Sequence, residues 1–173
     1  LLFAIQASQD DFPRFVFAPA SPAATYQLTK KAFTLSEKYQ VPVILLMDQY
    51  LTTTRVTQEA FPELPPGPET FIVNPEEMDA PETYKRYRFT ETGVSPRALP
   101  CRGKALVRVL GNEHDEAGHI TEDPEIRVRM MDKRSAKLTA MKAELEMPLA
   151  GHPESDILLL CWGSPGGVVR EAG

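Results

Sequence analysis

Apolar residues follow the order strand, helix, strand along the first third of the chain. Residues 12–18 form a short apolar run bounded by proline, which predicts a strand. Ser21 and Pro22 then supply a helix cap and a first helical residue. The run 41–47 is almost continuously apolar, as expected of a strand buried on both faces. This order predicts a right-handed crossover unit in a parallel α/β sheet.

The helix between these two strands carries one apolar stripe, because apolar residues recur there at steps of three and four. The stripe consists of Ala24, Leu28, Ala32, Leu35 and Tyr39. We expect one core to form from Phe15, Phe17, Leu28, Ala32, Leu35, Val43, Ile44 and Leu45. Parallel sheets bind ligands beyond the carboxyl ends of their strands, which places Asp48, Gln49 and Tyr50 near a candidate cleft. Asp48 could equally be an ordinary loop residue.

The second half of the chain is less regular. Prolines recur through residues 52–101, so the pattern predicts a long connection with brief strands at 71–73 and 84–90. Residues 105–110 form another apolar, strand-like run. The pattern of residues 124–146 predicts a helix whose basic side chains point outward. Its predicted inner face consists of Val128, Met131, Leu138, Met141 and Leu145. Residues 156–162 predict a further buried strand, followed by a glycine-rich turn and a new helix.

An acidic loop with the sequence GNEHDEAGHITEDP occupies residues 111–124 and holds two of the three histidines, His114 and His119. So many charges cannot be buried without partners, so the loop is predicted to face water, a cleft or another subunit. At its end Asp123 is expected to cap the following helix, with Pro124 as the first helical residue.

The residues of this loop are compatible with several kinds of site to different degrees. A calcium-binding loop is excluded, because placing Gly118 at the central glycine puts Ala117 and Pro124 at ligand positions. A zinc site is disfavoured, because the two histidines are five residues apart with no further His or Cys nearby. We therefore assign no metal to this chain. A solvated acidic loop and a loop whose polar groups meet a ligand or a subunit both remain open.

Composition narrows the class of protein. The formal net charge of −5, without a cluster of Lys and Arg, argues against a nucleic-acid-binding protein. Cys101 and Cys161 lie far apart, so neither a disulfide framework nor an iron–sulfur cluster is predicted, and a reduced cytoplasmic setting fits. No run is long enough to span a membrane. The chain begins at Leu1 in the middle of a pattern and ends just after a helix begins, so we expect a piece of a longer protein.

Several segments together resemble the alpha subunit of 2-oxoacid:ferredoxin oxidoreductases, particularly the 2-oxoglutarate type. They are FPRFVFAPASP, EKYQVPVILLMDQYL, YKRYRFTETGVSPRALP, GNEHDEAGHITEDPEIRVRMMDKRSAKL and DILLLCWGS. The resemblance extends over nearly the whole chain, and the acidic loop is its most specific part. Cys101 departs from the glycine expected at that position, and the closing GSPGG is richer in glycine than expected.

The resemblance implies oxidative decarboxylation of a 2-oxoacid with thiamine diphosphate, transfer of the acyl group to coenzyme A, and passage of electrons to ferredoxin. It implies that residues 1–58 belong to a pyrimidine-binding domain and that residues 154–173 begin a second, transketolase-C-terminal-like domain. Residues 59–147 then form the connection, the acidic loop and the helix. A beta subunit would supply the diphosphate and magnesium site and an iron–sulfur cluster, and a gamma subunit or domain would complete the assembly.

The family's cofactor-activating glutamate and substrate-binding arginine motif would lie before Leu1, so neither is assigned to a residue here. The remaining candidates are in the acidic loop: His114 and His119 for catalysis, and Glu113 and Thr121 for cofactor binding. We expect these four to face the cofactor cleft or the partner subunit. A non-catalytic α/β subunit-interaction module is the alternative function, and a small metal-dependent hydrolase is a more distant one. We expect the isolated chain to be inactive.

Overall fold

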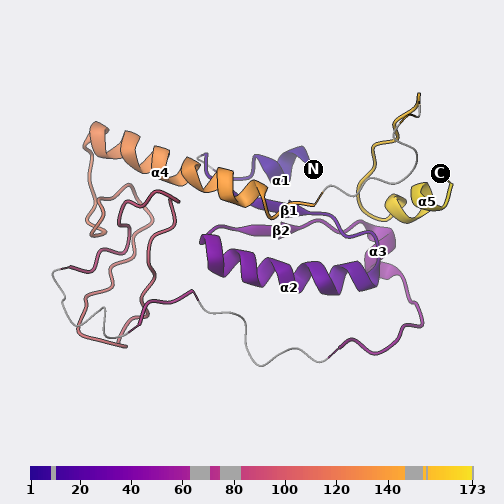
Figure 1. The fold of residues 1–173 in the computed structure, drawn as a ribbon, viewed down its shortest axis with the longest axis horizontal. Coiled ribbons are helices and arrows are strands. Elements are labelled where there is room, and N and C mark those ends of the chain that lie inside the picture. Colours follow the sequence, from indigo (N-terminus) through magenta and orange to yellow (C-terminus); the bar gives the residue numbers. More distant parts are fainter. Residues whose placement is uncertain (9–10, 63–70, 75–82, 147–153, 155, 173) are drawn as a thin grey trace. The chain divides into compact units, whose positions relative to one another are not determined.

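The computed structural model describes every residue except 9–10, 63–70, 75–82, 147–153, 155 and 173 (Figure 1). The chain forms two compact units. The first unit contains Leu1–Ser36, Val41–Pro68 and Leu145–Gly173, and the second unit contains Glu37–Gln40 and Glu69–Glu144. The helices and strands are α1 (Leu2–Ile5), β1 (Phe15–Phe17), α2 (Pro22–Tyr39), β2 (Val43–Leu45), α3 (Gln49–Thr53), α4 (Pro124–Lys142) and α5 (Pro165–Ala172).

The first unit contains the predicted strand–helix–strand arrangement. β1 and β2 pair in parallel, with Phe15 opposite Val43 and Phe17 opposite Leu45. α2 connects the two strands and runs alongside β2 (Figure 1). The helix begins where the sequence predicts, because the Ser21 hydroxyl accepts a hydrogen bond from the Ala24 amide at 3.1 Å. The prediction of a parallel α/β unit is therefore confirmed.

The core of the first unit is smaller than predicted. Phe15 and Leu35 are each only 2% exposed, and the Phe15 and Phe17 rings stack with centroids 5.8 Å apart. All three residues of β2 are only half-buried, so the prediction that this strand is buried on both faces is wrong for the described structure. The described sheet has two strands, so β2 has a described neighbour along only one of its edges.

The predicted strand at 156–162 is absent from the part of the chain that the structure describes. Its apolar side chains are largely exposed, with Leu158 at 82% and Leu160 at 95%. A strand needs a neighbouring backbone to accept and donate hydrogen bonds, and no described segment pairs with this run. The helix predicted after the glycine-rich turn is present as α5.

The second unit packs α4 against an irregular chain that includes residues 83–120. The predicted strands at 84–90 and 105–110 do not form in the described structure, and Ile72 makes only an isolated parallel bridge with Arg97. Side-chain hydrogen bonds replace a strand ladder here. For example, the Tyr87 hydroxyl accepts a hydrogen bond from the Leu110 amide at 3.0 Å.

α4 ends at Lys142 rather than at 146, and its inner face differs from the prediction. Met141 is buried at 3% exposure, as predicted, and Met130, which was not predicted inside, is buried at 1%. In contrast, Val128 is 60% exposed and Leu138 is 43% exposed. Leu145, also predicted inside, is 51% exposed. The expectation that all basic residues point outward is wrong as well, because Lys133, Arg134 and Lys137 are half-buried. Long basic side chains can cover apolar surface with their methylene stems, which a hydrophobic pattern does not register.

Gly93 brings the irregular chain close to α4. Its φ of +73° lies in the left-handed region, and a Cβ atom there would lie 2.2 Å from the Lys133 carbonyl oxygen. Only glycine fits both requirements, so this position sets how closely α4 and the preceding segment pack.

Candidate functional site

The acidic loop folds as a short hairpin in the second unit. His114 and Ile120 form an antiparallel bridge, and the Thr121 amide donates to the Glu113 carbonyl at 3.1 Å. The turn closes with a hydrogen bond from the Gly118 amide to the Asp115 carbonyl at 3.1 Å. Gly118 has a φ of +83°, and an added Cβ would approach the Arg108 carbonyl to 2.9 Å, so glycine is required at the tip.

Asp115 organises the tip of this hairpin. One carboxylate oxygen accepts hydrogen bonds from the amides of Ala117 at 2.9 Å and His119 at 2.8 Å. The other lies 3.2 Å from Nδ1 of His119. Partial burial acts to raise the pKa of Asp115, but the hydrogen bonds from His119 and Ala117 outweigh it and hold the pKa below its ordinary value. The carboxylate is therefore ionised at neutral pH and fixes the orientation of the His119 ring.

Glu113 is held by two arginines of α4. Arg127 donates to it at 2.8 Å, and Arg134 forms a second ion pair with the same carboxylate. Burial acts to raise the pKa of Glu113, but hydrogen bonding and the charge of Arg134, with Arg127 adding to them, bring it below the ordinary value. This residue thus anchors the loop to the helix, and its carboxylate is already engaged.

His114 lies inside the second unit, with an exposed fraction of 8%. Its ring packs on Tyr87 with centroids 3.7 Å apart, and Nδ1 lies 2.6 Å from the Asn112 carbonyl oxygen. The expected place of His114 at the cofactor cleft or the partner subunit stays a prediction, and in this structure its ring contributes to the packing of the loop. The partner that buries it, Tyr87, is far away in sequence, so no local pattern could have identified the contact.

Thr121 and Asp123 complete the end of the loop. The Thr121 hydroxyl accepts a hydrogen bond from the Asp123 amide at 3.2 Å. The Asp123 carboxylate accepts from the amides of Glu125 at 2.8 Å and Ile126 at 3.4 Å, which confirms the predicted cap of α4.

His119 is the loop candidate that combines exposure with a fixed orientation. Its side chain is 59% exposed. Nδ1 faces the Asp115 carboxylate, and Nε2 lies next to the guanidinium of Arg108. Both ring nitrogens are therefore engaged, and the exposed imidazole together with the Arg108 guanidinium presents polar groups suited to an anionic ligand. Of the four candidates, only His119 presents such chemistry at the surface of the second unit.

Asp48 at the carboxyl end of β2 has a structural role. One of its oxygens accepts from the Leu51 amide at 2.8 Å and caps α3, and the other accepts from the Ser164 amide at 2.9 Å. The bond from Leu51, followed by those from Ser164, lowers the pKa of Asp48. Gln49 and Tyr50 are exposed. Asp48 therefore joins β2 to the turn before α5.

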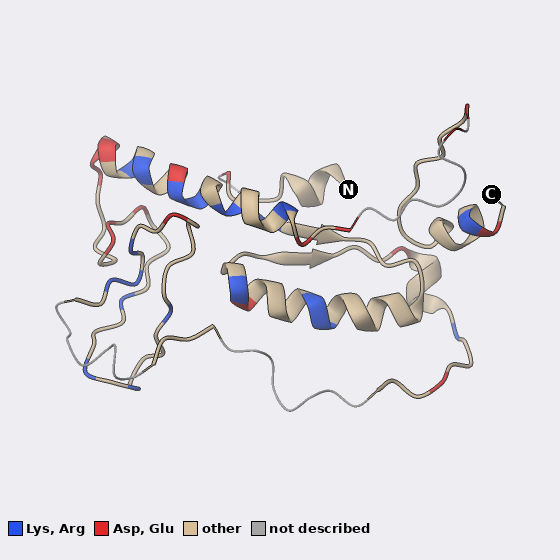
Figure 2. Cartoon of the chain, in the orientation of Figure 1, with Lys and Arg blue, Asp and Glu red and all other residues tan. Residues whose placement is uncertain are grey.

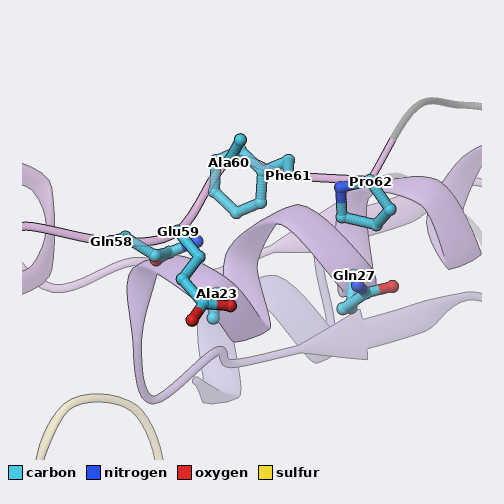
Figure 3. A pocket seen from close by; sticks show the side chains of 7 residues that line it. All are labelled: Ala23, Gln27, Gln58, Glu59, Ala60, Phe61 and Pro62. Carbon is cyan, nitrogen blue, oxygen red and sulfur yellow. The ribbon is translucent and has the colours of Figure 1, made fainter.

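An open pocket lies beside α2 in the first unit (Figure 3). It is lined by Ala23, Gln27, Gln58, Glu59, Ala60, Phe61 and Pro62. The Phe61 ring stacks on Tyr26 at a centroid distance of 4.2 Å, and the Tyr26 hydroxyl donates to the Pro62 carbonyl at 2.8 Å. The lining residues contain one carboxylate and no histidine or cysteine, so the pocket offers a surface for binding rather than a catalytic group.

Metal binding and membrane insertion find no support in the described ranges. No group of three or more His, Cys, Asp or Glu side chains there could hold a metal ion. None of the described helices combines the length and apolar character that crossing a bilayer requires.

Sequence reasoning missed a cluster of basic residues on α4. Arg129, Lys133 and Lys137 follow one another at intervals of four and therefore lie on one face of the helix. This regular spacing was visible in the sequence, but only the structure shows that the last two are half-buried. Figure 2 shows basic residues recurring along α4.

Similarities to known proteins cover almost the entire chain. The family model described as pyruvate flavodoxin/ferredoxin oxidoreductase, thiamine diP-bdg, matches residues 1–133. The alpha subunit of 2-oxoacid:ferredoxin oxidoreductase 1 from Sulfurisphaera tokodaii is 36% identical over 178 residues, an alignment that covers 99% of this chain and 27% of that protein. The 2-oxoglutarate synthase subunit KorA of Methanocaldococcus jannaschii is 25% identical over 166 residues, covering 95% of this chain and 43% of that subunit.

A solved structure with the same fold is the 2-oxoglutarate:ferredoxin oxidoreductase of Magnetococcus marinus, with 2-oxoglutarate, coenzyme A and succinyl-CoA bound. It matches with a TM-score of 0.78 and 31% identity, over 99% of this chain and 30% of that one. The chain thus spans between about a quarter and less than half of the length of these relatives.

Proposed function

We propose a function from one premise: the chain belongs to the thiamine diphosphate-binding family of pyruvate flavodoxin/ferredoxin oxidoreductases. It serves as part of the alpha subunit of a 2-oxoacid:ferredoxin oxidoreductase. The complete enzyme oxidatively decarboxylates a 2-oxoacid, joins the acyl group to coenzyme A and passes the two electrons to ferredoxin. The observation that carries this proposal is the structural match over 99% of the chain to an enzyme of this activity.

The 2-oxoacid proposed is 2-oxoglutarate. The Magnetococcus marinus enzyme is named for this substrate, and so is the Methanocaldococcus jannaschii subunit. The Sulfurisphaera tokodaii relative is named more broadly for 2-oxoacids, so a broader range of substrates is the competing possibility within the same reaction class.

The cofactor proposed is thiamine diphosphate with magnesium, shared with a partner subunit. The described residues do not complete such a site, because no cluster among them could hold a metal ion and Asp48 is engaged as a cap. We therefore assign no catalytic step of the cofactor to residues of this chain. The partner proposed to supply the diphosphate and magnesium site is a beta subunit, which also carries an iron–sulfur cluster. A gamma subunit or domain accompanies it, and the complex resides in the cytoplasm.

The domain division proposed follows the resemblance: a pyrimidine-binding domain to residue 58, a connection with the acidic loop and α4 to residue 147, and the start of a second domain from residue 154. Within this arrangement, His119 is the residue that meets substrate, coenzyme or partner. Asp115 orients it, whereas Glu113, His114 and Thr121 hold the loop in place.

The test is an assay of the complete protein that carries this chain, purified with the subunits that accompany it. Reduction of ferredoxin is followed with thiamine diphosphate, magnesium and coenzyme A, using 2-oxoglutarate and pyruvate in parallel. We expect reduction to require coenzyme A and to be faster with 2-oxoglutarate. Pyruvate as the better substrate would contradict the specificity alone. No reduction with any 2-oxoacid, despite stable association with partner subunits, would favour the non-catalytic interaction module.

A further inference from the structure

Three cationic side chains of α4 lie against the irregular segment 85–95 of the second unit. The Arg129 guanidinium is 4.2 Å from the centroid of the Phe89 ring, and the Lys133 ammonium is 5.8 Å from the centroid of the Tyr87 ring. Lys137 lies against Gly93, where its Cγ is 3.1 Å from the position that a Cβ would occupy. These three side chains are thus part of the packing between α4 and this segment.

A further cation approaches the same place from the irregular segment itself. The Arg86 guanidinium lies 5.1 Å from the centroid of the Tyr87 ring. Arg86 and Lys133 therefore approach one ring, although like charges repel each other. The face of an aromatic ring attracts cations, but it carries no net charge that could neutralise them.

Three of these cations, Arg86, Lys133 and Lys137, are half-buried, and within the described ranges no carboxylate pairs with any of the three. Lys137 makes one hydrogen bond, to the Gln40 carbonyl at 3.4 Å, and Lys133 and Arg86 make none with described residues. The nearby acids are already engaged. Glu113 pairs with Arg127 and Arg134, whereas Glu116 pairs with Lys85 at 3.0 Å and accepts a hydrogen bond from the Phe89 amide at 2.9 Å.

Burial and the surplus positive charge together change the pKa of the two lysines. Burial, followed by repulsion from neighbouring cations, lowers the pKa of Lys133 and of Lys137 to about 8. An anion placed among these side chains would oppose both the repulsion and the loss of solvation, so the arrangement favours binding an anion.

We propose that Arg86, Lys133 and Lys137 form a binding site for a phosphate group of a multiply charged ligand. A carboxylate carries one negative charge and would leave most of this positive charge uncompensated, whereas a phosphate monoester carries about 1.5 to 2 at neutral pH. Arginine contributes directed donors and lysine contributes a point charge, a combination common in phosphate recognition. The observations that carry this site are independent of the proposed oxidoreductase activity.

Inorganic pyrophosphate is the probe, used with the complete protein and its accompanying subunits. Lysine labelling with an amine-reactive reagent is followed by mass spectrometry, with and without pyrophosphate. We expect pyrophosphate to protect Lys133 and Lys137, whereas the exposed Lys142 at the end of the same helix is labelled equally in both conditions. Equal labelling of Lys133 and Lys137 with and without the probe would overturn the proposal. This measurement needs no variant and no turnover, so its result is independent of the oxidoreductase assignment.

Calorimetric titration with pyrophosphate then compares matched variants. Lys133→Gln and Arg86→Gln should each weaken binding about tenfold or more, because each removes a charge-assisted hydrogen bond. Lys133→Arg should bind nearly as well as the natural protein, and Lys142→Gln should be unchanged. An equal loss in Lys142→Gln and Lys133→Gln would overturn the site in favour of diffuse attraction by the whole surface. If a variant does not fold, the labelling experiment on the natural protein still tests whether the phosphate site exists.

Thiamine diphosphate and coenzyme A both carry phosphate groups, so both are added in separate arms of the labelling experiment. Protection by coenzyme A but not by its form lacking the 3′-phosphate would identify that monoester as the group bound. Protection by thiamine diphosphate alone would identify its diphosphate. Each of these outcomes supports the site and names its ligand.

Discussion

Two histidines of one loop have different surroundings, and single substitutions should separate their roles. His119 is 59% exposed on its side chain and oriented by Asp115. Replacing it with alanine removes no buried contact, so stability should change by less than about 0.5 kcal/mol. Ferredoxin reduction by the complete enzyme should fall, because the exposed imidazole and its contact with Arg108 are lost. Glu122→Gln, an exposed neighbour in the same loop, is the control and should retain full activity. Normal turnover in His119→Ala would remove His119 from the proposed site.

His114→Ala should instead lower stability. The ring packs on Tyr87 at 3.7 Å and is only 8% exposed, and aromatic packing together with burial is worth about 1–2 kcal/mol. Urea unfolding measures the change, and the specific activity of the folded protein should remain near normal. Unchanged stability with lost activity would reverse the two assignments and return His114 to the functional site.

The sequence identified the candidate residues of the acidic loop, but not which of their side chains are exposed and which are held by partners. Charge patterning treats all polar residues of the acidic loop alike, because it registers only that so many charges cannot be buried without partners. Glu113 finds its partners on α4, and His114 finds Tyr87. The capping role of Asp123 was predictable because its donors lie only two and three residues ahead.

At the level of helices and strands, α2 is the best-defined element, and its apolar stripe predicts a stability change. Leu35 is 2% exposed, whereas Phe33 on the same helix is 67% exposed. Leu35→Ala should lower the free energy of unfolding by about 2–5 kcal/mol, because it leaves a cavity in a packed core. Phe33→Ala is the matched control and should lower the free energy of unfolding of the isolated chain far less. Similar losses in both variants would show that α2 is buried on both sides.

Periodicity and caps predicted α2, the start of α4 and the pairing of β1 with β2, because their determinants lie within a few residues. The apolar runs at 105–110 and 156–162 failed as strands, because strand formation depends on a neighbouring backbone that the run itself does not specify. The prediction of the inner face of α4 was partly wrong for another reason. The half-buried Lys133 and Lys137 pack there beside Met130 and Met141, and a hydrophobic pattern counts lysine as exposed.

The buried lysines of α4 predict how stability depends on pH. Their folded pKa of about 8 is below the ordinary 10.5, so between these values the unfolded chain binds more protons than the folded chain. Stability should therefore rise as pH increases from about 8 to about 10, relative to a variant without these charges. Denaturant unfolding of the natural chain and of Lys133→Met/Lys137→Met across this range measures the difference.

Other charges around these lysines set the size of that effect. Arg86 and Arg134 act to lower the pKa of both lysines, and Lys137 also acts to lower that of Lys133. Glu116 acts to raise the pKa of Lys133. The double variant should lose the extra pH dependence. Parallel curves for the two proteins would mean that both lysines are fully solvated in solution.

On the scale of the whole chain, family membership was predictable because many short segments agree in order over the full length. The family model over residues 1–133 and the structural match at a TM-score of 0.78 both confirm that prediction. The site was less predictable. In the proposed enzyme the active site is shared with a partner subunit, so residues outside this chain would complete it. The predicted domain boundaries at residues 58, 147 and 154 likewise remain predictions.

The isolated chain should show no oxidoreductase activity, even when supplied with thiamine diphosphate, magnesium, coenzyme A, 2-oxoglutarate and a dye acceptor. Two observations lead to this expectation. No metal-binding cluster occurs among the described residues, and the chain corresponds to 27% of the Sulfurisphaera tokodaii subunit and 30% of the Magnetococcus marinus chain. Cys101 and Cys161 cannot by themselves hold an iron–sulfur cluster, because such clusters require four protein ligands.

The rate of dye reduction tests this prediction, with a protein-free reaction as background and the complete enzyme as the positive control. Adding the purified partner subunits to the chain provides the decisive comparison, because a shared site predicts that any activity appears only on mixing. Pyrophosphate protection of Lys133 and Lys137 can be measured in the same samples. Protection without turnover would show that this chain builds the phosphate site without its partner subunits, whereas turnover by the isolated chain would contradict the requirement for a shared active site.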